Sequence, residues 1–472
     1  MAKAKKKNKK KLLEATLADG TTLFYEQEVL GEGSEGVVHF TEDRKSVVKF
    51  YKDLNDSKDP ERRRRIENIV YKYNPTLHPE SGDYWKSLYC WPAAVVVAPR
   101  LGVLVPAYPS TFFTKDGREK KLSWFISPRT RNLISKEERG DWLGHLKIAI
   151  MMARATRRLH SAGLAHSDLS YNNFLADPVI GTVNMIDLDS LVVPEVYPPS
   201  VAGTPGLIAP EVIMGQGAPS IRTDLHALAV LVYQTLLFRH PLRGPKINST
   251  LSAEEDEKLS MGAKALFIEH PHDQSNRPQG TFTSFERLGT YLAELINKSF
   301  VKYLHEPDYR PTAADWEQAL IRTTDLIHPC SNSQCELQWF VYGATCPGCG
   351  QKMTHHPVPL LQFYKEQRGK PGHFINERRQ LIVWPGLYLY KWHVFDHIRA
   401  GENADKTPQG YFHYHENRWY LYNLDMDAQL IEKGIQKTIP RKQFIPLQEG
   451  QQIRLSTETH GRIVYVQMLN QS

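Results

Sequence analysis

The stretch HSDLSYNN, residues 166–173, decides the fold of this chain. It fits the pattern H-x-D-x-x-x-x-N and follows directly on residues 141–162, whose apolar side chains recur at helical spacing up to a stop at Gly163. The acidic segment MIDLD, residues 185–189, comes next along the chain. This order predicts a long buried helix, a polar loop that presents Asp168, and a second acidic turn after it.

Short motifs extend this pattern in both directions. Downstream, GTPG at residues 203–206 leads into APE at 209–211, a Thr-Asp pair opens an apolar helix over 223–238, and YRPT occupies 309–312. Upstream, LGEGSEGVV at residues 30–38 fits G-x-G-x-x-G-x-V. Glycines let backbone amides approach phosphate oxygens because no Cβ stands in the way. Strand-like runs on both sides favour a glycine-rich lid over a nucleotide and argue against a Rossmann loop, which needs a helix directly after it.

A lysine and a glutamate follow the glycine-rich segment at spacings that suit an ion pair. Lys49 lies in the strand-like run SVVKFY, residues 46–51, and Glu67 lies in the helix-like run that begins at Glu61. A strand lysine that faces a helix glutamate is held against the α- and β-phosphates of a nucleotide. We therefore predict a Lys49–Glu67 pair. The alternatives are Glu61 in place of Glu67, or Glu67 as a surface partner of the neighbouring arginines.

In order and together, these motifs resemble the eukaryotic-type (Hanks-type) protein kinases over about residues 21–326. The resemblance implies an α+β bilobal kinase fold, with an N-terminal lobe over about 21–106 and a C-terminal lobe over about 107–326. It implies ATP and Mg²⁺ as cofactors. We expect a protein serine/threonine kinase that transfers the γ-phosphoryl group to hydroxyls of protein substrates and also phosphorylates itself.

The resemblance implies roles for individual residues. Asp168 would accept or orient the proton of the substrate hydroxyl, while Asn173 and Asp187 would hold Mg²⁺, a hard ion that prefers oxygen ligands. Adenine would hang from the backbone between the lobes. The predicted catalytic residues are Lys49, Glu67, Asp168, Asn173 and Asp187. The predicted nucleotide-binding residues are Gly31, Gly33, Gly36, Val38, Lys49, Val105, Ala107, Tyr108, Asn173 and Asp187.

Other residues carry structural or regulatory expectations. By resemblance, Glu211 pairs with Arg310 in the lower lobe, and Asp224 braces the backbone of the catalytic loop. Thr204 has two interpretations that the sequence leaves open: a regulatory phosphorylation site, or a structural threonine that bonds the catalytic loop. Pro106 has no amide hydrogen, so the donors that hold adenine must come from its neighbours.

Three departures from the family pattern lie in the catalytic segments. Ser167 replaces the arginine of H-R-D, which normally pairs with a phosphorylated activation loop, so activity should depend less on phosphorylation of that loop. Ser170 replaces a lysine that contacts transition-state charge. Leu188 and Asp189 replace the Phe and Gly of D-F-G, and we expect a stiffer loop there.

The sequence resembles one bacterial kinase group, associated with tellurite-resistance-type gene clusters, more closely than it resembles the eukaryotic-type kinases in general. This closer resemblance is carried by HSDLSYNNFL, IDLDSLVVPEVYPPSVAGTPGLIAPE and EPDYRPTAADWEQAL. That resemblance implies two partners, a metal-dependent protein phosphatase and a von Willebrand factor A domain protein. Two alternatives remain open. One is a pseudokinase scaffold that binds nucleotide and recruits partners. The other is a small-molecule kinase, against which the APE-like Glu211 and the GTPG segment favour protein substrates.

Four of the five cysteines fall within twenty residues. They form Cys330-x(4)-Cys335 and Cys346-x(2)-Cys349, and the second pair has the form of a zinc knuckle. Four thiolates in a tetrahedron suit Zn²⁺ in a closed structural site. We predict a zinc ribbon over residues 327–356 that the metal holds folded. The alternatives are iron in the same site, two reduced thiol pairs without metal, or ligation by one of His328, His355 and His356.

Residues 357–472 are rich in Tyr, Trp, Ile and Val in short runs separated by turn residues. This pattern predicts an all-β, sandwich-like domain that recruits partners. The runs RWYLYNL, residues 418–424, and IPLQEGQQIRL, residues 445–455, weakly resemble late strands of the forkhead-associated family, which binds phosphothreonine peptides. The early G-R and S-x-x-H signals of that family are missing from this sequence, so the likeness favours the fold more than the binding.

Composition places the chain among folded globular proteins. Its 472 residues are 41% hydrophobic and 24% charged, enough for several domains. Residues 1–11 hold seven lysines and no acid, which accounts for the whole net charge of +7. We expect a disordered basic tail over residues 1–20 and no nucleic-acid partner apart from contacts of that tail. Apolar runs such as residues 93–98 are far below a membrane span, and the basic start lacks the apolar core of a secretory signal, so we expect a cytoplasmic protein.

Overall fold

The computed structural model describes residues 11–33, 36–52, 59–194, 203–432 and 434–470. The chain divides into two compact units. The first contains most of the chain up to residue 317, and the second contains residues 141–143, 282–294 and 318–472. Among the described residues, no helix combines the length and the apolar character that a membrane crossing requires.

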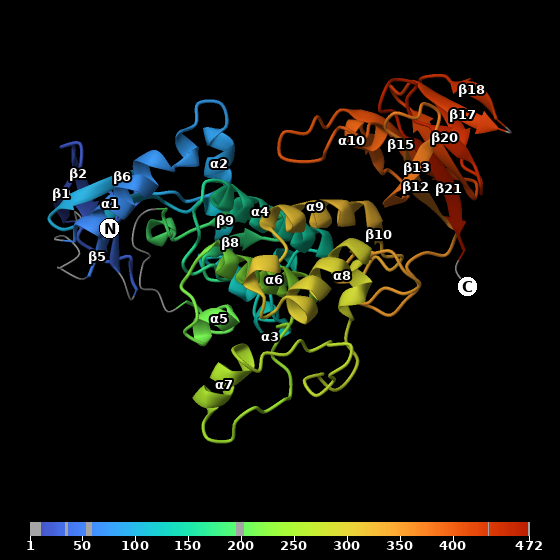
Figure 1. Ribbon diagram of the computed structural model, residues 1–472. Helices are drawn as coiled ribbons and strands as arrows, with labels where there is room; N and C mark the ends of the chain where they lie inside the picture. The colour runs from blue at the N-terminus through green and yellow to red at the C-terminus, as the bar shows by residue number, and fades with distance from the viewer. Residues whose placement is uncertain (1–10, 34–35, 53–58, 195–202, 433, 471–472) are drawn as a thin grey trace, which may run out of the picture. The chain divides into compact units, whose positions relative to one another are not determined.

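An antiparallel sheet opens the first unit (Figure 1, blue). Its strands within the described ranges have the spatial order β2-β1-β6-β7-β5-β4-β3. Their bounds are β1 Leu12–Leu17, β2 Thr22–Glu26, β3 Gly31–Glu32, β4 Gly36–Phe40, β5 Ser46–Tyr51, β6 Ala94–Ala98 and β7 Gly102–Pro106.

The first strand, β1, begins inside the segment that was expected to form a disordered tail. β1 pairs with β2 and β6, and Leu13, Ala15 and Leu17 pack into the apolar cluster on one face of the sheet. The expected disordered tail over residues 1–20 is therefore wrong from residue 12 onward, because alternating apolar side chains give this segment a buried face. Residues 1–10 lie outside the described residues.

The side chains of β5 fill both faces of the sheet. Val48 and Phe50 belong to the cluster that contains β1, whereas Tyr51 packs with Ile66 and Val70 on the opposite face. Ile66 lies in α1, Pro60–Glu67, and Val70 lies in the π-helical turn Asn68–Lys72 that continues it. Because side chains alternate along a strand, Lys49 lies on the same face as Tyr51, the face that this helical segment covers.

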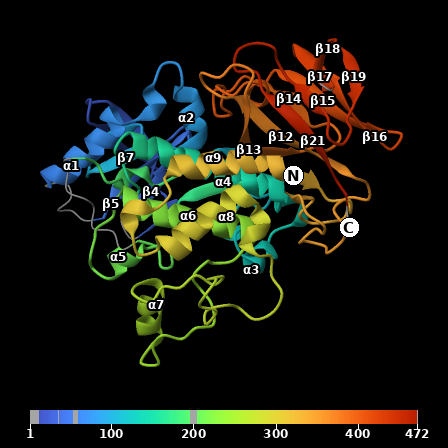
Figure 2. The ribbon, with the colours of Figure 1, turned by 45° about the vertical axis from the view of Figure 1, so that its right-hand side comes forward.

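Helices make up most of the rest of the first unit. Two of them, α4 and α6, lie side by side in both Figure 1 and Figure 2, and nearly every side chain of α6 is buried. A helix that is apolar all round belongs in a protein core, as the sequence predicts for residues 223–238. The α-helices are α2 Gly82–Leu88, α3 Pro128–Arg131, α4 Trp142–Ser161, α5 Pro210–Ile213, α6 Ile221–Leu237, α7 Ala253–Met261, α8 Thr290–Asn297 and α9 Ala313–Thr323. Of these, α4, α8 and α9 are divided between the two units.

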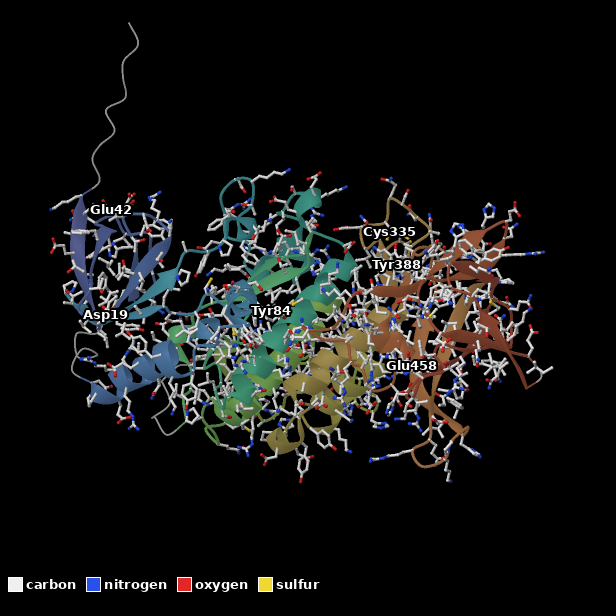
Figure 3. The ribbon with its side chains drawn as sticks, turned by 90° about the horizontal axis from the view of Figure 1, so that it is seen from above. Asp19, Glu42, Tyr84, Cys335, Tyr388 and Glu458 are labelled. Atoms are coloured by element: carbon white, nitrogen blue, oxygen red, sulfur yellow. The ribbon has the colours of Figure 1, made fainter. Side chains whose placement is uncertain are left out.

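A buried charged cluster joins three of these helices. Arg154 of α4 donates from Nε to Oε1 of Glu317 in α9 at 2.7 Å and from Nη1 to the hydroxyl of Tyr84 in α2 at 2.9 Å. Tyr84 is labelled in Figure 3.

A two-stranded hairpin follows the loop 166–173 directly along the chain, between α4 and α6 in sequence. Its strands are β8, Phe174–Asp177, and β9, Thr182–Met185. These elements fix the two ends of the loop that carries Asp168.

The second unit contains a cysteine-bearing hairpin and a β-sandwich. The hairpin strands are β10 Ile327–Pro329 and β11 Trp339–Val341. In the described part of the sandwich the two sheets have the orders β13-β12-β21-β20-β17-β18 and β14-β15-β16-β19 (Figure 2, orange and red). Their strands are β12 Val358–Glu366, β13 Phe374–Ile382, β14 Tyr388–Tyr390, β15 Pro408–His415, β16 Arg418–Asn423, β17 Ala428–Glu432, β18 Ile435–Ile439, β19 Gln443–Pro446, β20 Gln452–Arg454 and β21 Ile463–Leu469, with a short helix, α10 Lys391–Val394.

One apolar core lies between the two sheets. Phe363 and Val464 from the larger sheet pack with Phe412 and Leu421 from the smaller one, and all four are fully or almost fully buried. The strands alternate inward and outward residues, which is the physical basis of the all-β prediction. The resemblance to the forkhead-associated family stays a prediction.

A buried ion pair ties residues 318–326 to the sandwich. Asp325 accepts from Arg379 Nη2 at 2.9 Å and contacts His393 Nε2 at 3.2 Å. Burial by itself raises the pKa of Asp325, but the charges of Arg379 and His393 outweigh that effect and lower it. The end of α9 therefore belongs to the second unit, and the boundary expected between residues 326 and 327 does not separate the two units.

Candidate active site

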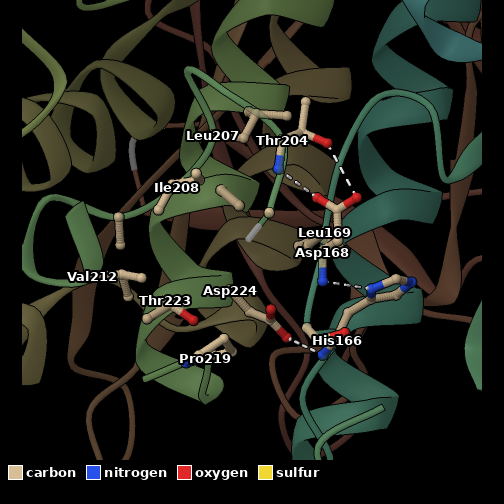
Figure 4. Close-up of a pocket in the computed structure, with 14 residues that line it drawn as sticks. His166, Asp168, Leu169, Thr204, Leu207, Ile208, Val212, Pro219, Thr223 and Asp224 are labelled. Atoms are coloured by element: carbon tan, nitrogen blue, oxygen red, sulfur yellow. Dashed lines mark hydrogen bonds between the residues drawn. The ribbon is translucent and has the colours of Figure 1, made fainter. Parts of the chain in front are cut away.

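The carboxylate of Asp168 is held from two segments, of which Figure 4 shows the one that contains Thr204. The backbone N–H of Thr204 donates to Asp168 Oδ1 at 2.9 Å, and the Thr204 hydroxyl donates to Oδ2 at 3.1 Å. Asn173 donates from Nδ2 to the backbone carbonyl of Asp168 at 2.8 Å and to its Oδ2 at 3.2 Å. Asp168 therefore has a fixed orientation on the wall of a hollow that residues 203–212 and the start of α6 also line.

Two contacts hold the backbone of the loop 166–173 in place. Asp224, 2% exposed in α6, accepts from the backbone N–H of His166 at 2.7 Å and contacts His160 Nε2 at 3.1 Å. Ser167, which occupies the place of the family arginine, donates its hydroxyl to the carbonyl of Ser190 at 2.8 Å. The loop is thus tied to the acidic turn that follows β9, a contact that the sequence did not reveal.

The structure brings Asn173 and Asp187 to neighbouring ends of the β8–β9 hairpin. The backbone N–H of Ile186 donates to the carbonyl of Asn173 at 2.9 Å. Asp187 adopts a left-handed conformation with φ 62°, which Asp tolerates better than most residues, and its side chain is 41% exposed. An amide and an exposed carboxylate are the oxygen donors that Mg²⁺ prefers, so these two residues fit the predicted ion.

Lys49 lies among carboxylates at the same place. Its Nζ donates to Asp187 Oδ1 at 2.7 Å and lies 2.9 Å from Asp189 Oδ2. Burial by itself lowers the pKa of Lys49, but Asp189 and Asp187 outweigh it and raise the pKa above its ordinary value. The ammonium therefore stays charged, which is the form that attracts phosphate.

The expected Lys49–Glu67 pair is wrong for this structure. Glu67 accepts from Nε of Arg63 at 2.8 Å, one helical turn away, and its side chain is 40% exposed. Glu61 contacts Arg64 at 3.9 Å. The reason is the run of arginines in α1, which supplies close i,i+3 and i,i+4 partners for both glutamates on the exposed side of the helix.

The glycine-rich segment forms the turn between β3 and β4. Gly33 N donates to Gly36 O at 2.9 Å, and residues 34–35 lie outside the described residues. A Cβ on Gly36 would lie 2.7 Å from the carbonyl oxygen of Phe50, so only glycine fits against β5 there. Gly31 and Gly33 face open space, and Val38 pairs in register with Lys49.

The connection after β7 is more restricted than expected. The backbone N–H of Ala107 donates to the carbonyl of Lys45 at 3.0 Å, so this amide is used within the sheet and does not serve adenine. Tyr108 packs with Val105 against Leu175 and Ile186, next to the catalytic loop. Ala107 and Tyr108 are the two residues after Pro106 that the sequence predicts to bind adenine. Tyr108 is therefore the better candidate for that contact.

The structural pair expected in the lower lobe is present. Arg310 donates from Nη1 and Nη2 to the two carboxylate oxygens of Glu211, both at 2.8 Å. The arginine side chain is 2% exposed and also donates to the carbonyl of Leu304 at 2.8 Å. A buried bidentate pair of this kind fixes α5, which contains Glu211, against the helical core.

The four clustered cysteines converge. Cys330 Sγ lies 3.6 Å from Cys349 Sγ, and Cys335 Sγ lies 3.6 Å from Cys346 Sγ; all four sulfurs are within 4.8 Å of one another. Four thiolates at about 2.3 Å from a tetrahedral zinc ion lie roughly 3.8 Å apart, so the spacing fits that ion. Hydrogen bonding from the Gln351 backbone lowers the pKa of Cys349 to about 7, whereas burial raises the pKa of the other three thiols.

Comparison with known proteins agrees with this geometry. Residues 128–319 match the family described as protein kinase domain. The dual serine/threonine and tyrosine protein kinase of Apis mellifera is 30% identical to this chain over 93 residues, which are 20% of this chain and 9% of that protein. The chain therefore matches less than a tenth of the length of that relative. The motifs, the braced Asp168 and the family match agree on one point: residues 128–319 of this chain are similar to the protein kinase domain family.

Proposed function

We propose that this chain is an ATP- and Mg²⁺-dependent protein kinase that phosphorylates Ser and Thr hydroxyls. The observation that carries the proposal is the orientation of Asp168, whose carboxylate is fixed by Thr204 and Asn173 beside a small hollow. A scaffold that only bound nucleotide would have no need for a carboxylate held in this way.

The chain's own residues have distinct tasks in this proposal. Asp168 accepts the proton of the incoming hydroxyl, and the ammonium of Lys49, whose charged form Asp189 and Asp187 favour, binds the phosphates. Asn173 and Asp187 would hold Mg²⁺, which when bound neutralises charge on the transferred group. Phosphoryl transfer needs positioning and charge neutralisation more than covalent chemistry, so these four residues suffice for the reaction class.

The choice of protein hydroxyls is supported by the activation segment. Residues 203–212 line the hollow beside Asp168, and the Glu211–Arg310 pair anchors them. An anchored segment beside the base is a surface on which an extended peptide can present its hydroxyl. The phosphatase and von Willebrand factor A partners, and recruitment through the sandwich, belong to the proposal only by family resemblance.

The test is transfer from Mg-ATP to three peptide pools whose only hydroxyl is Ser, Thr or Tyr. We expect labelled Ser and Thr peptides, no labelled Tyr peptide, and loss of transfer with EDTA or in Lys49→Met. Nucleotide binding without transfer in the unmodified protein would support the pseudokinase instead. Transfer to an aminoglycoside but to none of the three pools would support the small-molecule kinase.

We also propose that Cys330, Cys335, Cys346 and Cys349 hold a structural zinc ion. The converging sulfurs support this, and so does the short hairpin they join, which has few residues to form its own core. Elemental analysis of protein purified without chelator should give about one zinc per chain. Iron in that measurement would identify the alternative metal, and less than half an equivalent of any metal would contradict the proposal.

A further inference from the structure

The residue after Leu188 has an unusual place in this site. Where the family pattern has the glycine of D-F-G, this chain has Asp189, which is 4% exposed. Its Oδ1 accepts from Lys49 Nζ at 3.0 Å, and its Oδ2 accepts from the hydroxyl of Tyr51 at 2.7 Å. A carboxylate with both oxygens used in this way has one orientation only.

The helical segment that covers Lys49 offers no carboxylate to it. The π-helical turn Asn68–Lys72 is the part that contacts the turn Leu188–Ser190, and its inward side chains are Ile69 and Val70, both fully buried. Glu67 lies before that turn and bonds Arg63. The side chains that this turn buries are therefore apolar, and the nearest charged group of α1 is a cation, Arg62, which lies 4.3 Å over the ring of Tyr51. A buried ammonium then needs a negative partner from another element.

We propose that Asp189 is the positioning residue that holds Lys49 for the nucleotide phosphates, in the place of a helix glutamate. The proposal rests on the proposed function, because it concerns how the phosphate-binding lysine is oriented. Lys49 and Tyr51 extend from the same face of β5, two residues apart, so one carboxylate between them fixes both side chains.

This arrangement changes what controls the lysine. In kinases the pair between the strand lysine and the helix glutamate must be in place for transfer, and movement of the helix breaks it. Here the partner lies in a turn that Ser190 joins to the catalytic loop through the hydroxyl of Ser167. Lys49 is thus coupled to the catalytic loop, and a shift of α1 leaves its pairing intact.

The first measurement compares Asp189→Asn with Glu67→Gln, two substitutions that each remove one charge at constant size. We expect Asp189→Asn to lower kcat/KM for ATP about 100-fold and Glu67→Gln to change it by less than about twofold. Tyr51→Phe, which removes the second anchor of Asp189, should lower it about fivefold. Melting curves show whether each variant is folded, and Tyr51→Phe carries the comparison if Asp189→Asn is not.

The second measurement reads the pairing without any turnover. Acetic anhydride reacts slowly with an amine that is held in a hydrogen-bonded ion pair, so the acetylation of Lys49 relative to that of exposed Lys86, read by peptide mass spectrometry, reports how firmly Lys49 is held. Asp189→Asn should raise this ratio about tenfold, while Glu67→Gln leaves it unchanged. A merely structural role of Asp189 would not single out Lys49 in a folded variant.

The two measurements test the proposed function and the Asp189–Lys49 pair separately. If the unmodified protein transfers no phosphate, the proposed function fails, while the acetylation ratios still test the Asp189–Lys49 pair. The inference is overturned if Glu67→Gln, and not Asp189→Asn, lowers kcat/KM and raises the acetylation of Lys49. It is equally overturned if neither substitution alters Lys49.

Discussion

Thr204 holds both carboxylate oxygens of Asp168, one through its backbone N–H at 2.9 Å and the other through its hydroxyl at 3.1 Å. The sequence left two interpretations of this threonine open. The geometry supports the structural one, because a phosphate on this hydroxyl would bring about two negative charges against the carboxylate of Asp168. Thr204 then acts as a positioning residue for the base.

Thr204→Val should lower kcat about tenfold, because it removes the hydroxyl hydrogen bond and leaves the backbone one, a loss of about 1.4 kcal/mol at the transition state. Thr204→Ser keeps the hydroxyl and should stay within about twofold of the unmodified protein. Steady-state peptide phosphorylation measures both. Phosphate mapped to Thr204 in active protein, together with activation by Thr204→Glu, would show that the regulatory interpretation is correct.

Removal of one zinc ligand should unfold the cysteine-bearing hairpin. Cys346→Ser should bind less than about one tenth of an equivalent of zinc, since three thiolates leave the tetrahedral site incomplete. Cys90→Ala is the matched control, because Cys90 is buried away from the cluster and should leave the zinc content at about one. Elemental analysis of the three proteins decides the matter; full zinc content in Cys346→Ser would contradict the assignment of this ligand.

Breaking the Glu211–Arg310 pair should destabilise the first unit strongly. Glu211→Gln leaves the guanidinium of Arg310, 2% exposed, without its carboxylate, and should lower the free energy of unfolding by about 3 kcal/mol. Asp308→Asn is a control, since the Arg222–Asp308 pair is more than 60% exposed on both sides and should contribute less than about 1 kcal/mol. Urea unfolding measures both, and equal losses would show that burial does not set the strength of these pairs.

Two buried histidines should make stability fall below neutral pH. Burial lowers the pKa of His145 to about 3 and that of His240 to about 4. In the unfolded chain each takes up a proton near pH 6.5, so below that pH the unfolded state binds more protons than the folded one. The free energy of unfolding should therefore fall by about 1.4 kcal/mol per pH unit for each histidine, from roughly pH 6.5 down to pH 4.

Urea unfolding at pH 7.5, 6.5 and 5.5 measures this slope. His145→Gln keeps a donor for the carbonyl of Arg139 and should reduce the slope by about one histidine's share, about 1.4 kcal/mol per pH unit. His415→Gln changes a histidine whose side chain is 65% exposed and should leave the slope unchanged. A stability that stays level or rises between pH 6.5 and pH 5.5 would contradict the neutral, buried state of these histidines.

Local sequence pattern was sufficient to predict the helices and the loop that contain the residues of the site. The apolar spacing of residues 141–162 predicts α4, the polar loop follows it, and the run over 223–238 predicts α6, because helix periodicity is set by near neighbours in sequence. The converging cysteines also follow from their spacing alone. Strand alternation gave the all-β character of residues 357–472, although it did not give the order of the strands in either sheet.

The pairing of Lys49 with Asp189 could not be predicted from local sequence pattern. Asp189 lies 140 residues from Lys49 in sequence, and only the fold brings the two together. The rotation of α1 decides whether Glu67 faces inward, and a run of four arginines gave no signal of that rotation. The one clue was Asp189 itself, an acid in a glycine position, since a buried carboxylate needs a cation nearby.

The intact mass of the purified chain after incubation with Mg-ATP, beside Asp168→Asn, tests the central claim most directly. The account predicts mass added in steps of one phosphoryl group to the unmodified protein and none to the variant, because Asp168 orients the hydroxyl that receives the phosphate. Equal phosphorylation of both proteins would contradict it, since the residue that the loop, Thr204 and Asn173 hold in place would then have no part in transfer.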